Sequence, residues 1–170
     1  MRLNLILRTA ICLEVGLFVT FTQSHNILIG LEALTSFGVG YALVTLFVAL
    51  LQRKKLNSYA NLPLAALALV IGLVATQVPA AAGLFWFRIL VAAWALLSGA
   101  YELYLARRTG FKSVTGKELM VSSIMGLILG ILFITVPLQA LDAVGFFGAY
   151  MVVCAVHLGI SAASERSTAN

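Results

Sequence analysis

Six apolar runs separated by short polar breaks constrain this chain more than any other feature. They cover residues 3–22, 27–51, 62–78, 84–106, 119–137 and 141–163. A helix needs about 20 apolar residues to cross the hydrocarbon core of a bilayer, so each run has roughly the length of one span. Only 10% of the residues are charged, which is far below the share that soluble domains carry. The sequence therefore predicts an all-α membrane protein with six transmembrane helices in a single domain, residues 1–170.

The basic residues predict the orientation of this domain. Those outside the apolar runs lie near the chain ends and in the second and fourth breaks: Arg2, Arg53, Lys54, Lys55, Arg107, Arg108, Lys112, Lys117 and Arg166. The other three breaks contain no Lys or Arg. Because Lys and Arg are retained on the cytoplasmic side, we expect both termini and both basic loops in the cytoplasm of a bacterial inner membrane.

A cleaved signal peptide is the alternative interpretation of the first run. Arg2 and Arg8 precede an apolar stretch, but Glu14 interrupts it and no small-residue cleavage site follows. We therefore expect this run to be a retained helix.

Prolines and small residues recur at similar places, which predicts three helical hairpins with weak internal repeats. Pro79 and Pro137 end the third and fifth runs, and Gly72 and Gly130 each lie seven residues before those prolines. Small residues four apart let helix backbones approach closely in lipid. Such pairs are Ala68/Gly72, Ala95/Gly99, Gly126/Gly130 and Ala155/Gly159. We expect them to pack inside one bundle, and a homodimer contact is the alternative.

The unusual residues are ionisable groups inside the predicted spans: Arg8, Glu14, Glu32, Arg88, Glu102 and His157. A charge inside the membrane is costly, so it indicates either pairing or function. At about 1.5 Å per residue, Glu32 and Arg88 share a depth in the outer half, and we expect them to form an ion pair. Arg8, Glu102 and His157 share a depth in the inner half, where pairing is also expected.

Glu14 lies near the centre of its span without a base at the same depth. Desolvation favours the neutral acid there, so we expect it to donate a hydrogen bond to another helix. The functional alternative is proton exchange through Glu14, with His157 as a second station.

No motif of an enzyme, a metal centre or a nucleotide site is present, so no catalytic residue, metal or cofactor is predicted. Cys12 and Cys154 lack the paired spacing of a zinc site or a disulfide framework and are expected to be buried small hydrophobes. The net charge of +5 is explained by basic loops that face anionic lipid heads. Membrane lipids, and not nucleic acid, are therefore the expected contacts.

Two segments resemble the HdeD-like family of small membrane proteins. Residues 122–140, SSIMGLILGILFITVPLQA, are similar to the family's small-residue helix that ends in proline. Residues 94–103, WALLSGAYEL, are similar to its segment with Trp followed by Ser-Gly. The resemblance covers residues 60–165 and leaves out the first hairpin. It implies a six-helix inner-membrane protein linked to acid resistance, and it carries over no catalytic residues.

Two functions follow from these observations. The first is a structural or stress-response membrane protein, acting as a homo-oligomer or as an accessory subunit of a larger membrane assembly. The second is a small proton-coupled transporter or channel that uses Glu14. Transporters commonly break their helices in the middle of the membrane, whereas proline here is confined to the ends of the runs. We therefore favour the first function.

Overall fold

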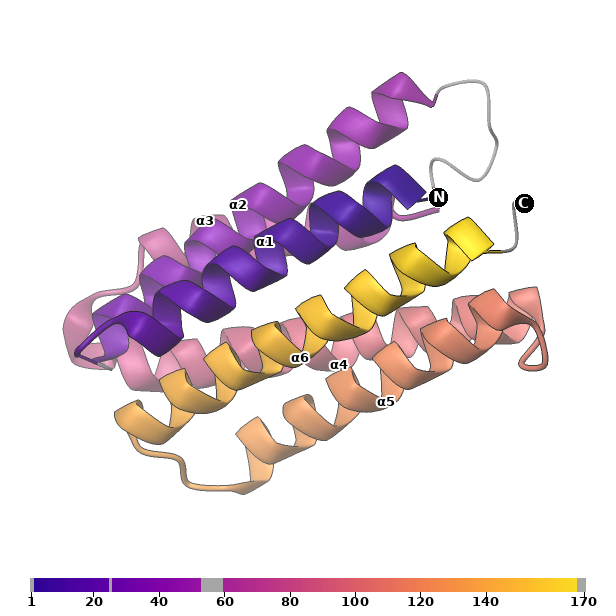
Figure 1. The fold of residues 1–170 in the computed structure, drawn as a ribbon. Coiled ribbons are helices and arrows are strands. Elements are labelled where there is room, and N and C mark those ends of the chain that lie inside the picture. The colour runs from indigo at the N-terminus through magenta and orange to yellow at the C-terminus, as the bar shows by residue number, and fades with distance from the viewer. Residues whose placement is uncertain (1, 25, 53–59, 168–170) are drawn as a thin grey trace.

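The structure, a computed structural model, describes residues 2–24, 26–52 and 60–167 (Figure 1). It is a bundle of α1 (Arg2–Phe21), α2 (Ile27–Leu51), α3 (Leu62–Thr76), α4 (Gly83–Thr109), α5 (Val114–Thr135) and α6 (Ala140–Ser167). A short 3-10 turn, η2 (Ala80–Ala82), precedes α4. The all-helical class with six helices is confirmed, and α1, α2, α4, α5 and α6 are long and apolar enough to cross a membrane.

The third helix is shorter than the predicted span 62–78. α3 has 15 residues, which rise about 22 Å and so fall short of a hydrocarbon core of roughly 30 Å. It begins with Pro63 in its first turn, where the missing N–H leaves no hydrogen bond unmade. It ends at Thr76 because Pro79 disfavours helical backbone just before it.

The two ends of the bundle differ in chemistry. Figure 1 shows the N- and C-terminal ends and the α4–α5 loop together at one end, and the turns after α1, α3 and α5 at the other. The first end carries Arg107, Arg108, Lys112 and Lys117, and we call it the basic end. The second is called the turn end. Arg53, Lys54 and Lys55 lie outside the described residues.

The helices pack most closely in pairs that differ from the predicted hairpins. The short turns join α1 to α2, α3 to α4 and α5 to α6 as expected, but the most extensive contacts join α2 to α3, α4 to α5 and α1 to α6. The even-numbered helices α2, α4 and α6 all contact one another. The fold is therefore a central trio of helices, each closely covered by one odd-numbered helix.

Glycines explain why these pairs approach so closely. A Cβ atom at Gly38 on α2 would lie 2.8 Å from the Gly72 Cα of α3. A Cβ atom at Gly99 of α4 would lie 3.0 Å from a backbone oxygen of α5, and one at Gly16 of α1 would lie 2.9 Å from a backbone nitrogen of α6. Each pair thus crosses at a position that only glycine can occupy without a shift of backbone.

The predicted packing glycines all lie against another helix of the same chain. Their neighbours are α2 for Gly72, α5 for Gly99, α4 for Gly126 and Gly130, and α1 for Gly159. Packing inside the bundle is therefore confirmed.

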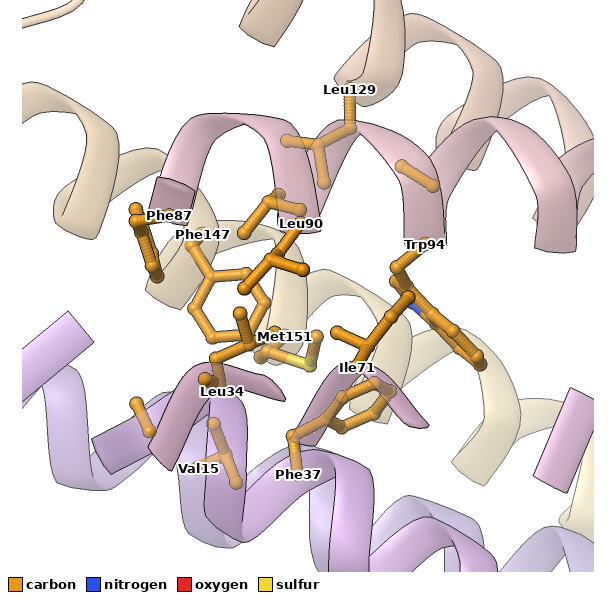
Figure 2. Packing of buried hydrophobic residues seen from close by; sticks show 14 of the residues in the cluster. Val15, Leu34, Phe37, Ile71, Phe87, Leu90, Trp94, Leu129, Phe147 and Met151 are labelled. Carbon is orange, nitrogen blue, oxygen red and sulfur yellow. The ribbon is translucent and has the colours of Figure 1, made fainter. Parts of the chain in front are cut away.

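Aromatic side chains fill the centre of the bundle. Figure 2 shows Phe37, Trp94 and Phe147 converging from α2, α4 and α6. The ring centroid of Phe37 lies 5.1 Å from that of Trp94 and 6.4 Å from that of Phe147. The ring centroids of Phe87 and Phe147 are 5.7 Å apart. Edge-to-face contacts of this kind are favourable, so the aromatic cluster is a packed core between the two ends.

Candidate functional site

A buried ion pair joins α1 to α4 in the half of the bundle nearer the basic end. The Nη2 atom of Arg8 lies 3.4 Å from Oε1 of Glu102, and the side chains are only 11% and 9% exposed. The hydroxyl of Ser122 on α5 donates a hydrogen bond of 2.5 Å to Oε2 of Glu102. Pairing between the inner-half charges is thereby confirmed for Arg8 and Glu102.

The local sequence places both charges on core-facing sides of their helices. On α1, Arg8 is followed at helical spacing by the buried residues Cys12, Val15 and Val19. On α4, Glu102 follows Ala95 and Ser98 and precedes Ala106, all of which are buried. Residues three or four apart share one helix face, so each charge continues a buried stripe.

Arg8 keeps several donors unused in this environment. Its guanidinium lies over the ring of Tyr41, with 4.8 Å between Cζ and the ring centroid. The group has five N–H donors, yet its bond to Glu102 is its only hydrogen bond within the described chain, and the buried Nε has no acceptor. Buried polar groups are nearly always hydrogen-bonded. The described part of the chain therefore leaves the hydrogen bonding of Arg8 incomplete.

A cavity of about 350 Å³ extends from this ion pair toward the basic end. Its polar lining includes Asn4, Asn61, Arg108, Glu118, Ser122 and His157. A second cavity of about 30 Å³ shares Arg8 and Glu102 with the first and is also lined by Tyr41 and Trp94. The two cavities together thus extend from charged residues near the helix ends to the aromatic core.

His157 belongs to the same cavity. Its ring lies on α6, is half-buried, and has Nε2 3.2 Å from the carbonyl oxygen of Glu118 on α5. The structure therefore brings three of the six ionisable residues, Arg8, Glu102 and His157, to one site. Sequence reasoning missed Ser122 and Tyr41, the other partners of this ion pair.

Arg88 lies in the other half of the bundle and is not paired with Glu32. It donates hydrogen bonds to the carbonyl oxygens of Phe133, at 3.2 and 3.4 Å, and of Val136, at 2.7 Å. The last carbonyls of a helix have no partner within the helix and carry partial negative charge, so the end of α5 attracts a neighbouring guanidinium. The predicted Glu32–Arg88 ion pair is therefore wrong.

Glu14 and Glu32 face outward from α1 and α2. Both side chains are exposed, and neither has a hydrogen bond or an ion pair to any described residue. The predicted hydrogen bond from Glu14 to another helix is thus not formed, because the side chain points away from the bundle. Neither carboxylate lines a cavity beside His157.

The remaining candidates are the two cysteines and the side chains that could ligate a metal. Cys12 is buried and Cys154 half-buried, and both are free thiols. Within residues 2–24, 26–52 and 60–167, no three His, Cys, Asp or Glu side chains form a group that could hold a metal ion. The arrangement of Arg8, Glu102, Ser122 and His157 is suited instead to hold a polar ligand or to join helices.

Comparisons with protein-family models, with curated proteins and with solved structures found no match to this chain.

Proposed function

We propose that this protein is a non-enzymatic accessory subunit of a membrane assembly. It docks through the outward side of α1 and α2 against a partner helix that carries a basic side chain. The observation that supports this most is the pair of exposed carboxyl groups of Glu14 and Glu32, which lie on two adjacent apolar helices and have no partner among the described residues.

The two carboxyl groups lie at similar heights in the bundle. Glu14 is seven residues before the end of α1 at Phe21, about 10 Å from the turn end. Glu32 is five residues after the start of α2 at Ile27, about 8 Å from the same end. Around them the exposed side chains are apolar, such as Leu17 and Leu28. Both charges therefore face lipid in the isolated protein.

A carboxylate that faces hydrocarbon is unfavourable by about 2.5–3.5 kcal/mol near the centre of a span. A basic side chain from a neighbouring helix offsets this cost through an ion pair in a low dielectric. The outward side of α1 and α2 is thus complementary in charge to a helix with Lys, Arg or His at that depth.

A second copy of this chain is a poorer match to that requirement. Among the bases within its described spans, Arg8 is buried against Glu102 and Arg88 binds the carbonyls at the end of α5. His157 lies in the half nearer the basic end. A second copy would have to break one of these interactions to supply a base, whereas a different protein would not.

The proposal includes an orientation in a bacterial inner membrane, with the basic end and both termini in the cytoplasm. It is supported by the start of α1 and the end of α6, which lie at the same end of the bundle as Arg107, Arg108, Lys112 and Lys117. In a cysteine-free background, Lys112→Cys should react with a membrane-impermeant thiol reagent only from the cytoplasmic side. Ala81→Cys, near the turn end, should react only from the opposite side, and labelling of both from one side would contradict the orientation.

A role in stress response of the acid-resistance type is the second part of the proposal, and the resemblance to HdeD-like proteins supports it. Survival of a deletion strain after an acid pulse tests this part separately. Survival equal to that of the parent strain would contradict it without bearing on the docking surface.

Photo-crosslinking in native membranes tests the docking proposal. A photoreactive amino acid at Leu17, one helical turn after Glu14, should crosslink to a different membrane protein. The matched control is Ile128 of α5, which is equally apolar and more exposed, and it should give no such product. The crosslinked partner should contain a basic residue in its spanning helix.

The Leu17 product should be lost when both Glu14→Gln and Glu32→Gln are introduced, because the amides keep the side-chain shape but carry no charge. A crosslinked homodimer would overturn the proposal in favour of a second copy. A product that is unaffected by the two substitutions, or no product at all, would also overturn it.

A further inference from the structure

We propose that the cavity beside Arg8 is a binding site for a small zwitterion, a molecule with one anionic oxygen group and one ammonium group. This inference is independent of the docking surface on α1 and α2, which lies on the outside of the bundle.

The unused donors of Arg8 indicate the anionic group. Arg8 lines the cavity and makes one long hydrogen bond to Glu102, at 3.4 Å. Its Nη1 donors have no acceptor within the described residues. A guanidinium presents its donors as a planar fork that matches the two oxygens of a carboxylate or a phosphate. A ligand with such a group would complete the hydrogen bonding of Arg8.

The charge balance of the cavity indicates the ammonium group. Arg8 is already matched by Glu102. Besides the imidazole of His157, the outer part of the cavity contains one guanidinium, Arg108, and one carboxyl group, Glu118. Neither Arg108 nor Glu118 has an ion-pair partner in the part of the chain that the structure describes. A ligand with a single negative charge would leave excess negative charge around Glu102 and Glu118. A zwitterion leaves the balance unchanged and gives Glu118 a partner.

The dimensions of the cavity suit a small ligand. Its volume of about 350 Å³ is at the lower end of the range for small-molecule sites. Beyond Arg8 and Glu102, the second cavity is lined by Tyr41 and Trp94, whose ring centroids lie 5.3 Å apart. The same chemistry is present in a free amino acid and in an ethanolamine lipid headgroup.

Trp94 provides a reporter for this site. It lines the second, smaller cavity together with Arg8 and Glu102, which also line the first. The other tryptophan, Trp86, is 41% exposed and lies on the far side of the aromatic core. In a Trp86→Phe background, we expect 4-aminobutanoate to change Trp94 fluorescence saturably in detergent. Butanoate and butylammonium, which each carry one of the two charges, should bind at least about tenfold more weakly.

Three variants locate the binding. Glu118→Gln removes the proposed ammonium partner at a half-exposed position and should weaken 4-aminobutanoate about tenfold while leaving butanoate unchanged. Arg8→Lys keeps the positive charge but removes the fork, so it should weaken both compounds. Lys117→Gln, an exposed neighbour that does not line the cavity, is the matched control and should change neither.

Calorimetry on the same samples detects 4-aminobutanoate binding even if it does not change the fluorescence of Trp94. The proposal would be overturned if 4-aminobutanoate produced no heat and no fluorescence change, or if all three compounds bound with equal affinity. It would also be overturned if Glu118→Gln and Lys117→Gln had the same effect on binding. Nanodiscs then identify the source of the ligand. If the affinity for 4-aminobutanoate falls only in phosphatidylethanolamine discs, the lipid headgroup competes for the site and is its ligand. If the affinity is equal in phosphatidylethanolamine and phosphatidylglycerol discs, the ligand is a soluble zwitterion.

Discussion

The same residue types lie in two contrasting environments in this bundle. Arg8 and Glu102 point inward and form an ion pair supported by Ser122 and Tyr41. Glu14 and Glu32 point outward without a partner in the described chain. Arg8 and Glu14 lie on the same helix, about 9 Å apart along its axis, but on different faces of it. The face of the helix on which a charged side chain lies determines whether it forms contacts inside the bundle or is exposed on its outer surface.

The largest expected effect comes from breaking the inward pair. Glu102→Leu leaves Arg8 buried without a counter-charge and should lower the free energy of unfolding by about 3–5 kcal/mol. Arg8→Leu should do the same for Glu102. The double variant should recover a substantial part of the loss, which unfolding titrations in mixed micelles can measure. Losses that simply add would show that the two groups are not coupled.

The glycines at the close helix contacts should matter for stability because of their shape, as the buried ion pair does because of its charge. Gly38→Ala places a methyl group against the Gly72 backbone of α3 and should destabilise the protein by about 1–3 kcal/mol. Gly145→Ala is the matched control, because nothing lies within 4 Å of a Cβ atom there. It should be neutral or slightly stabilising, since alanine favours helix over glycine. Equal effects in thermal unfolding would contradict the assigned helix pairs.

Arg88 is an intermediate case, because it is half-buried and binds backbone in place of a carboxylate. Arg88→Ala should cost about 1–2 kcal/mol through the loss of its bonds to the end of α5. Glu32→Gln should leave stability unchanged. If Glu32→Gln destabilises as much as Arg88→Ala and their effects are coupled, the two residues form an ion pair after all.

The smallest effect is expected at Glu14. In the isolated protein, Glu14→Gln and Glu14→Leu should both change the free energy of unfolding by less than about 0.5 kcal/mol. The reason is that the Glu14 side chain has no partner in the described bundle. A loss with Glu14→Leu that Glu14→Gln does not show would indicate a hydrogen bond to another helix.

Much of the fold could be predicted from the sequence because the bilayer imposes simple rules. The apolar runs locate the helices, and proline locates the end of α3. The choice of close helix pairs could not be predicted in the same way. It depends on which glycine faces which helix, and Gly38 and Gly16 were not among the pairs of small residues recognised in the sequence.

The candidate site was only partly predictable for a related reason. Depth correctly brought Arg8 and Glu102 together but wrongly paired Glu32 with Arg88. Helix periodicity carries the missing information: Arg8 continues a stripe with Cys12 and Val15, whereas Glu14 lies beside the exposed residues Leu13 and Leu17. Ser122 gives no such signal, because serine is common in apolar helices and the neighbouring Ser123 is the same residue type.

Labelling with a hydrophobic carbodiimide tests the central claim most directly. The reagent enters from lipid and modifies carboxyl groups that it can reach there. In the protein reconstituted alone, mass spectrometry of its peptides should show modification of Glu14 and Glu32 and none of Glu102. Modification of Glu102 with protection of Glu14 would contradict the assignment of inward and outward faces on which the account depends.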